Sequence, residues 1–220
     1  MNLQRLETFN VEKHHEGMIE MTTAEQIMEK KKLMRAELNK QTRNGDELWR
    51  KATEKLGTFL NEYGSLPKGE RMHTDDRIFP AAAVYLTVKA ELGEKKAYAV
   101  VENAAIKGCA GTAKKLEKTM KIPGMRGLFV KLWNPLTKKI FGSNSGFKNV
   151  FYPKEKGAYR MDVTSCPYFR HLTELGCPEL TKIFCENDER VYGNLPGLKF
   201  ERTGTLGKGA KCCDFYLKKI

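Results

Sequence analysis

Two segments decide the fold: YRMDVTSCPYFRHLTELGCPELTKIFCENDER, residues 159–190, and PGLKFERTGTLGKGAKCCDFYL, residues 196–217. Five of the six cysteines lie in these segments, and both contain charged residues among apolar ones. Their outer parts have the composition of strands, whereas apolar residues recur at helical spacing in the middle. We therefore expect strands over residues 158–166, 200–206 and 211–217, and helices over residues 167–175 and 178–192.

Upstream of these segments the sequence has the spacing of helices. Apolar residues recur three and four positions apart, and glycine or proline stands at most of the expected ends. The expected helices cover residues 24–40, 46–63, 81–92, 97–120 and 125–141. A loop at residues 142–146 then leads to a strand at residues 147–152. The pattern predicts an α+β fold, in which a helical region precedes an antiparallel sheet with helices packed on one side.

The domain organisation follows from this change of pattern. We expect a helical region at residues 22–146 and a sheet-and-helix part at residues 147–220, which together form one compact domain. Residues 1–21 carry little pattern and are expected to be a loose arm. His14 and His15 lie in this arm, where adjacent histidines among charged residues are expected to be solvated.

Composition and charge limit the class of protein. Of the 220 residues 40% are hydrophobic, which is enough for a packed core, and the formal net charge is +12. This charge favours anionic partners, such as nucleic acid, acidic lipid or a small carboxylate. No apolar run is long enough to span a membrane, and the first residues lack the apolar region of a secretory signal. We therefore expect a cytoplasmic protein whose cysteines are reduced thiols.

The helix expected over residues 125–141 is basic and amphipathic. Its apolar stripe faces away from Arg126, Lys131, Lys138 and Lys139. This alternation is typical of a surface helix that packs on its own domain and exposes a solvated basic face. The same pattern would also suit a helix lying on a membrane or on a phosphate-bearing surface.

Two cysteines that precede prolines are candidate nucleophiles. Cys166-Pro167 and Cys177-Pro178 each place a thiol where a helix is expected to begin, because proline suits the first helical turn. Unpaired backbone N–H groups and the helix dipole lower the pKa of a thiol in that position. The alternative is that each Cys-Pro pair is only the start signal of a helix.

The second of these helices carries a polar stripe. Cys177, Thr181, Cys185 and Asp188 fall on one side of it at helical spacing. A carboxylate three residues after a thiol can orient the thiol or act as a general base, although a surface aspartate beside a buried cysteine gives the same pattern. His171 on the preceding helix could pair with a thiolate, but its charged neighbours favour a solvated surface.

Strand alternation separates the polar residues near the end of the chain. Cys213 falls on the same face as the apolar residues Phe215 and Leu217, whereas its sequence neighbours Cys212 and Asp214 fall on the opposite face. Side chains on opposite faces do not readily bind one metal ion, and the sequence has no Cys-x-x-Cys pair, so no metal site is expected. Arg202 stands in the neighbouring strand, where either a substrate carboxylate or Asp214 could pair with its guanidinium.

Several short motifs in these segments resemble those of one known family. In chain order they are Cys166-Pro167-Tyr168, Leu175-Gly176-Cys177-Pro178-Glu179-Leu180, Phe184-Cys185 with Asp188, Pro196, Phe200-x-Arg202-Thr203-x-Thr205-Leu206, Gly209 and Cys213-Asp214-Phe215. The series resembles the L-2-amino-thiazoline-4-carboxylic acid hydrolase family over residues 150–217.

The resemblance implies a hydrolase of the C–N bond class that acts on a small cyclic carboxylate. The name-giving reaction opens a cyclic isothiourea to an N-carbamoyl-cysteine, so a nucleophile must attack the carbon between ring sulfur and ring nitrogen. From helix position and stripe geometry we expect Cys177 as the nucleophile and Cys166 as the second choice. The expected remainder of the catalytic set is Cys185, with Asp188 or His171 as the base. The expected substrate-binding residues are Arg202 as the carboxylate clamp, Thr203, Tyr168, Asp214 and Cys213. No cofactor is expected.

Two departures from the family pattern leave the exact substrate open. Thr181 stands where many relatives would have another cysteine, and Cys212 adds a thiol. The alternative function is a small-molecule-binding or sensory domain, similar to 4-vinyl reductase domain proteins, in which the cysteines hold a ligand or a metal. Nucleic-acid binding through the net charge is a third option, although no known binding module is visible. The first helices could also form a homo-oligomer.

Overall fold

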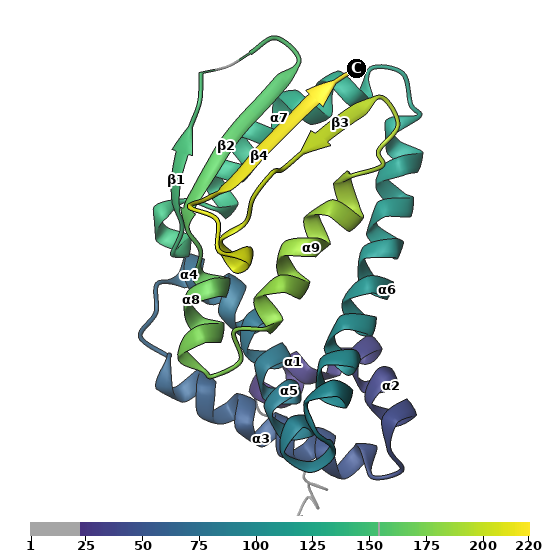
Figure 1. The fold of residues 1–220 in the computed structure, drawn as a ribbon, viewed down its shortest axis with the longest axis vertical. Coiled ribbons are helices and arrows are strands. Elements are labelled where there is room, and N and C mark those ends of the chain that lie inside the picture. Colours follow the sequence, from purple (N-terminus) through teal and green to yellow (C-terminus); the bar gives the residue numbers. More distant parts are fainter. Residues whose placement is uncertain (1–22, 154) are drawn as a thin grey trace, which may run out of the picture.

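The protein has a helical half and a sheet half, which lie one above the other in the computed structural model (Figure 1). The structure describes residues 23–153 and 155–220, so the arm expected at residues 1–21, with His14 and His15, lies outside the described residues. The predicted α+β fold is confirmed, because a helical region precedes an antiparallel sheet. No helix of the described residues combines the length and the apolar character needed to cross a membrane.

The helices that precede the sheet come first in the chain, and all but the last of them build the helical half. They are α1 (Thr23–Glu29), α2 (Lys32–Gln41), α3 (Gly45–Glu62), α4 (Lys68–His73), the π-helical turn η1 (Thr74–Ile78), α5 (Phe79–Leu92), α6 (Glu94–Met120) and α7 (Met125–Ile140). The elements that follow are the 3₁₀ turn η2 (Ser143–Ser145), β1 (Lys148–Phe151), β2 (Ala158–Ser165), α8 (Pro167–Glu174), α9 (Leu180–Tyr192), β3 (Leu198–Glu201), the 3₁₀ turn η3 (Leu206–Lys208) and β4 (Cys213–Lys219).

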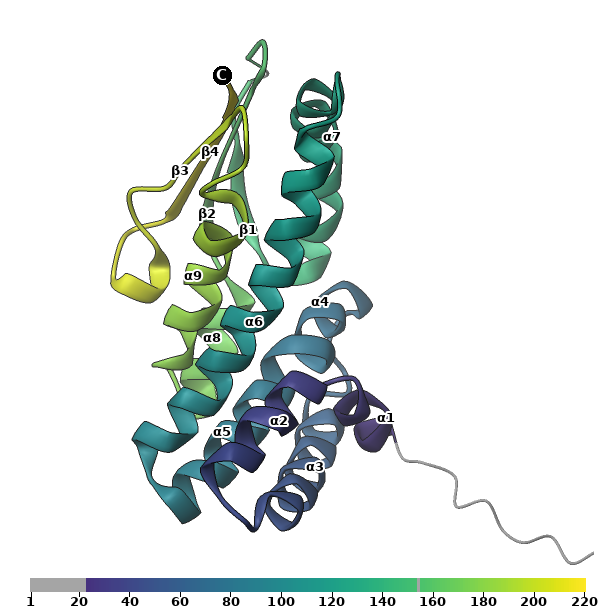
Figure 2. The same ribbon diagram turned by 90° about the vertical axis from the view of Figure 1, so that its right-hand side faces the viewer.

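Helix α5 is the centre of the helical half. It begins with Pro80 in its first turn, ends at Gly93 with φ +85°, and buries side chains all round. Helices α3 and α6 pack against it. The 27-residue α6 is long enough to extend beside α9 toward the sheet half (Figure 2) and therefore connects the two halves.

The sheet presents one face to helices. Its strand order is β1-β2-β4-β3, and all neighbouring strands are antiparallel. The register sets Val163 opposite Cys213, so both side chains point to the same, buried face. Helix α7 packs on that face, where the hydroxyls of Thr137 and Tyr159 lie 2.6 Å apart. The helices thus lie on one side of the sheet, as predicted (Figure 2).

Two hydrophobic clusters form the interior, and the chain passes between them repeatedly. The first lies among α1 to α6 and takes in Leu172 of α8 and Ile183 of α9. The second lies between the sheet and α7. Tyr168 packs against both clusters. Residues of α8 and α9 are therefore held between the two halves, where a site can form.

The first expected helix is two helices. The prediction of one helix over residues 24–40 was wrong, because the chain leaves the helix at Lys30 and Lys31. The Lys31 ammonium reaches the backbone carbonyl of Asp76 at 2.5 Å and its carboxylate at 2.7 Å. This tertiary contact, which fixes the corner between α1 and α2, has no counterpart in the local sequence pattern.

Strand β3 is shorter than expected. The prediction placed a strand over residues 200–206, but β3 ends at Glu201. Beyond it, the N–H groups of Thr203 and Gly204 donate to the Asp214 carboxylate at 3.0 and 2.7 Å. A side chain thus replaces the neighbouring strand as the hydrogen-bond acceptor, as is common where aspartate shapes a turn.

A buried carboxylate joins α4 to α8. Glu70 is only 5% exposed, accepts a hydrogen bond from Arg170 and lies 2.7 Å from Nε2 of His171. Gly146, with φ +78°, backs onto this carboxylate, and a Cβ there would lie 2.6 to 2.9 Å from its carbon and oxygens. Only glycine permits both this backbone conformation and this approach.

Gly146→Ala is expected to lower the free energy of unfolding by about 2 to 4 kcal/mol, because it strains the backbone and displaces a buried charged group from its partners. Urea unfolding followed by circular dichroism measures the change. The matched control is Gly111→Ala in α6, where a Cβ meets nothing within 4 Å; it is expected to stabilise the helix by about 0.5 to 1 kcal/mol. Equal stability of the two variants would contradict the account of the Glu70 contact.

Candidate active site

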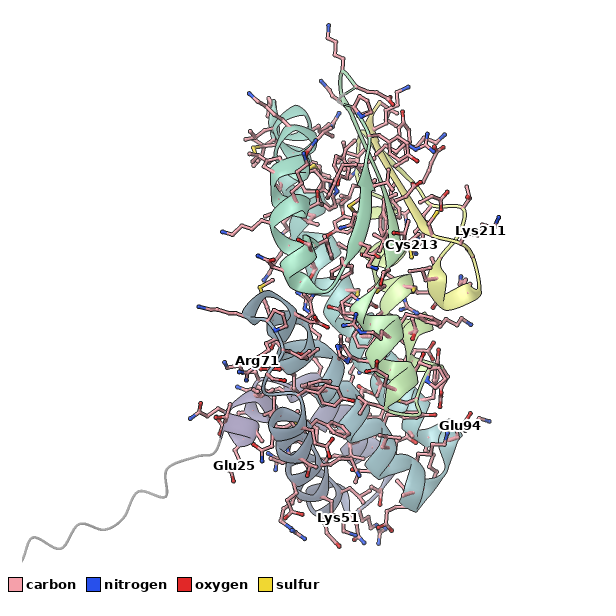
Figure 3. All side chains as sticks on the ribbon, turned by 90° about the vertical axis from the view of Figure 1, so that its left-hand side faces the viewer. Glu25, Lys51, Arg71, Glu94, Lys211 and Cys213 are labelled. Atoms are coloured by element: carbon pink, nitrogen blue, oxygen red, sulfur yellow. The ribbon has the colours of Figure 1, made fainter. Side chains whose placement is uncertain are left out.

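A cavity of about 260 Å³ lies between the inner face of the sheet, α7 and α9. Its wall is mostly apolar and aromatic, with a few polar side chains, which is the usual make-up of a small-molecule site. The sequence-predicted residues on this wall are Cys166, Tyr168, Cys185, Asp188, Arg202 and Cys213. Figure 3 shows Cys213 well inside the molecule, whereas Lys211, two residues earlier, lies at its edge. The fold thus gathers six of the ten candidate residues around one space.

Cys185 and Cys213 form a thiol pair in this cavity. Cys185 lies in the middle of α9, and Cys213 is the first residue of β4. The Cys213 Sγ accepts a hydrogen bond from the N–H of Leu206 at 3.2 Å. Gly207 follows closely, and a Cβ on it would lie only 3.1 Å from the Cys185 Sγ. The turn η3 can therefore bring backbone N–H groups against both sulfurs because residue 207 has no side chain.

The pKa of the Cys185 thiol lies below its ordinary value. The main cause is a hydrogen bond from the Cys213 thiol, and the charge of Arg202 and the N–H of Gly207 act in the same direction, against the effect of burial. The same hydrogen bond, together with burial, raises the pKa of Cys213, which keeps its proton. The buried Thr205 hydroxyl has no well-aligned partner among the described residues, and the nearby Cys185 thiolate would satisfy it. Cys185 is thus the thiol best suited to be a nucleophile.

Arg202 holds Asp188 beside this thiol. Its Nη1 donates to Asp188 Oδ2 at 2.9 Å, and its Nη2 donates to the backbone carbonyl of Cys185 at 2.6 Å. Phe200 and Phe215 flank the guanidinium, with ring centroids 5.8 and 5.3 Å away. The Arg202 side chain is 6% exposed, so its hydrogen-bonding capacity is directed inward. Its partner is Asp188, and the prediction that Asp214 could be the partner was wrong.

Asp188 is a carboxylate suited to proton transfer. Burial raises the pKa of Asp188 to about 6, although the charges of Arg202 and Arg77 oppose the rise. About a third of its side chain is exposed, and this part borders the cavity. A carboxyl group with a pKa near neutrality can both give and take a proton at physiological pH.

The two Cys-Pro thiols do not have the low pKa expected of them. Cys177 is fully buried in the helical cluster, and α9 begins only at Leu180, so its thiol is not at a helix N-terminus. Burial raises the pKa of Cys177 to about 12. Cys166 does cap the start of α8 and lines the cavity, but burial outweighs the N–H groups of the helix and raises its pKa to about 12 as well.

Three more candidates lie outside the cavity. His171 was expected on a solvated surface, but it is 2% exposed and bonded to Glu70, so it stabilises the contact of α4 with α8. Asp214 lies on the sheet face opposite Cys213, because neighbouring residues of a strand alternate. Its carboxylate accepts the Thr203 hydroxyl at 2.5 Å, so these two residues bind each other at the loop after β3.

Sequence reasoning missed Arg77, His73 and their connection to Tyr168. Burial lowers the pKa of His73. Its Nε2 lies 2.9 Å from the carbonyl oxygen of Ile140, and its Nδ1 lies 3.1 Å from the hydroxyl oxygen of Tyr168. Neutral His73 therefore donates from Nε2 and accepts the Tyr168 proton at Nδ1. Arg77, on the cavity wall, interacts with the Tyr168 oxygen. The sequence signal was faint: a charged run directly before the most buried helix.

No group of three or more histidine, cysteine, aspartate or glutamate side chains is placed to hold a metal ion within residues 23–153 and 155–220. The cysteines on the cavity wall are free thiols. The reactive and charged groups of the cavity wall include three thiols, a carboxyl group and two guanidinium groups.

Comparison with known proteins identifies the family. The family model described as L-2-amino-thiazoline-4-carboxylic acid hydrolase matches residues 71–217. Neither the curated proteins nor the solved structures include a match. The matched region runs from before η1 to Leu217 in β4, and it contains every residue of the cavity described above. The chain therefore belongs to the L-2-amino-thiazoline-4-carboxylic acid hydrolase family.

Proposed function

We propose that this protein hydrolyses a small cyclic isothiourea that carries a carboxylate, of the 2-amino-thiazoline-4-carboxylate type, and that Cys185 is its nucleophile. The observation that carries the proposal is the thiol of Cys185, which has a lowered pKa and shares the cavity wall with Asp188. Family membership supports a hydrolase of this kind. Cys177, the first choice from the sequence, is not retained because it is buried away from the cavity.

In the first step the Cys185 thiolate attacks the carbon between ring sulfur and ring nitrogen. The new bond joins the Cys185 sulfur to this carbon, and the ring carbon–sulfur bond breaks. The departing ring sulfur takes the proton of the neutral Asp188 carboxyl group. The ring is then open, and the carbon remains attached to Cys185 as an isothiourea.

In the second step water completes the hydrolysis. Its oxygen bonds to the same carbon, one of its protons passes to the former ring nitrogen, and the other passes to Asp188. The bond to the Cys185 sulfur breaks, and Cys185 leaves as a thiolate. The product is an N-carbamoyl-cysteine, and both residues regain their starting protonation states. Because the ring nitrogen stays on the carbon, the bond that opens the ring in this scheme is carbon–sulfur.

Arg202 and Cys213 position these groups. Arg202 bridges the Asp188 carboxylate and the Cys185 carbonyl, so it fixes the two reacting side chains relative to each other. Cys213 keeps its proton and stabilises the Cys185 thiolate. The proposal requires a reduced Cys185, so it places the protein in a reducing compartment such as the cytoplasm.

The test is turnover of 2-amino-thiazoline-4-carboxylate by the purified protein. We expect multiple turnovers to N-carbamoyl-cysteine, quantified by mass spectrometry of the small molecules so that the protein's own thiols do not interfere. Boiled protein is the control for spontaneous hydrolysis. Saturable binding of the compound without turnover would contradict the proposal and favour the small-molecule-binding alternative.

A further inference from the structure

A second cavity, of about 510 Å³, meets the first at Asp188. It lies between α6, α9 and the corner of α1 and α2, and a run of small residues on α6, including Ala105 and Gly108, leaves the space open. Its outer wall contains Lys30, Lys31 and Lys32. The two cavities share Arg77, Phe184, Asn187, Asp188 and Tyr192. The reaction proposed above uses none of this second space.

Arg77 is the cation at the junction. It lies in the π-helical turn η1, a type of turn that often occurs at functional sites, and it is exposed although it lines both cavities. The two acidic residues before it are engaged elsewhere: Asp75 pairs with Arg71 at 2.9 Å and Asp76 with Lys31 at 2.7 Å. No carboxylate of the described chain forms an ion pair with Arg77. Its guanidinium thus remains available to a ligand.

Arg202 cannot take this role without breaking other contacts. It was the carboxylate clamp expected from the sequence, but it already bonds to Asp188 and to the Cys185 carbonyl between two phenylalanine rings. Turning the Arg202 guanidinium to a ligand would leave the Asp188 carboxylate without its partner, which costs free energy. Arg77 has no comparable commitment, and Tyr168, held by its donation to His73, presents its oxygen to the guanidinium.

The first cavity has more apolar wall than a small polar ring requires. Trp133, Phe141, Phe147, Met161 and Phe215 all line it. Apolar surface of this kind contributes to affinity only when a ligand covers it. The wall therefore indicates a ligand with an aromatic or alkyl group in addition to its acid.

We infer that Arg77 binds the acidic group of the ligand at the junction of the cavities, and that the ligand is an amphipathic carboxylic acid whose apolar group lies in the first cavity. The lysines of the second cavity attract this acid from solution. Calling this ligand a substrate rests on the proposed function, whereas binding of the acid at Arg77 does not depend on turnover.

The test compares 4-phenylbutyrate with its neutral amide, 4-phenylbutyramide, by isothermal titration calorimetry. We expect the wild-type protein to bind the acid at least about tenfold more tightly than the amide, because a charge-assisted bond is lost with the amide. Arg77→Met should bring the ratio of the two affinities close to one by weakening the acid alone. The control Arg50→Met removes an exposed arginine of α3, paired with Glu54, and should leave the ratio unchanged.

Equal affinity for acid and amide in the wild-type protein, or a ratio that survives Arg77→Met, would overturn the inference. If Arg77→Met does not fold, Arg77→Lys is measured instead. This variant keeps the charge but loses the two-pronged donor, and an unreduced ratio of acid to amide affinity there counts against Arg77.

Acetate, which has no apolar group, should bind at least about tenfold more weakly than 4-phenylbutyrate. If the acid binds through Arg77 but no thiazoline is turned over, the proposed function fails and the binding site stands.

Discussion

Replacing Cys185 by serine is expected to lower kcat for ring opening by at least about a thousandfold. A hydroxyl has a far higher pKa than the Cys185 thiol, so at neutral pH almost no alkoxide is present to attack the ring carbon. The hydrogen bond of Cys213 and the charge of Arg202, which favour the thiolate, do too little to ionise a hydroxyl. Steady-state turnover of 2-amino-thiazoline-4-carboxylate measures the effect.

Two matched variants make this result specific. Cys212→Ser makes the same substitution beside the sheet but outside the cavity, and it should keep the wild-type kcat. Cys177→Ser tests the nucleophile first expected from the sequence. It should keep the wild-type kcat per folded molecule, although a hydroxyl in the helical cluster lowers stability by about 1 to 3 kcal/mol. Loss of turnover in Cys177→Ser, with retention in Cys185→Ser, would reverse the assignment.

The second large effect is expected from Arg202→Met, which removes one partner of a largely buried ion pair. Loss of one partner from a fully buried pair costs about 3 to 5 kcal/mol. Because part of Asp188 borders the cavity and a methionine still packs between Phe200 and Phe215, we expect a loss of about 2 to 3 kcal/mol. Urea unfolding measures it. Arg50→Met, which breaks an exposed pair, should cost less than about 1 kcal/mol.

Arg202→Met should also make Cys185 less reactive in mildly acidic solution. In the wild-type protein the thiolate is present above the lowered pKa of Cys185 and is lost as the pH falls through it. Without Arg202 the pKa rises, so this loss begins at higher pH. Alkylation by iodoacetamide at about pH 6.5, followed by mass spectrometry of the Cys185 peptide, should therefore slow several-fold. Unchanged alkylation would show that Arg202 does not stabilise the thiolate.

Local pattern predicted the frame of this fold well. Alternation placed Cys213 on the buried face of its strand, and helical spacing placed Cys185 and Asp188 together on one helix, because both periodicities are properties of a single element. The change from helical spacing to strand alternation after residue 146 likewise predicted the order of the two halves. These predictions needed no knowledge of what each element packs against.

The pattern could not predict which thiol ionises. A Cys-Pro pair signals a helix start, but the helix after Cys177 begins three residues later, and its thiol is enclosed by the helical cluster. The pKa of Cys185 depends instead on Cys213 and Arg202, which are 28 and 17 residues away in the sequence. Arg77 was missed for a related reason, since the two cavities that it lines are built from elements far apart in the sequence.

The corner between α1 and α2 contributes charge to the second cavity but none of the groups proposed to react. The family match begins at residue 71, whereas Lys30 to Met34, which wall the second cavity, precede it. The lysines proposed to attract the acid thus precede the matched region, whereas Arg77 and the thiol centre lie within it. Exchanging the first two helices for those of a homologue would therefore change the charge on the wall of the second cavity while Arg77 and the thiol centre stay in place.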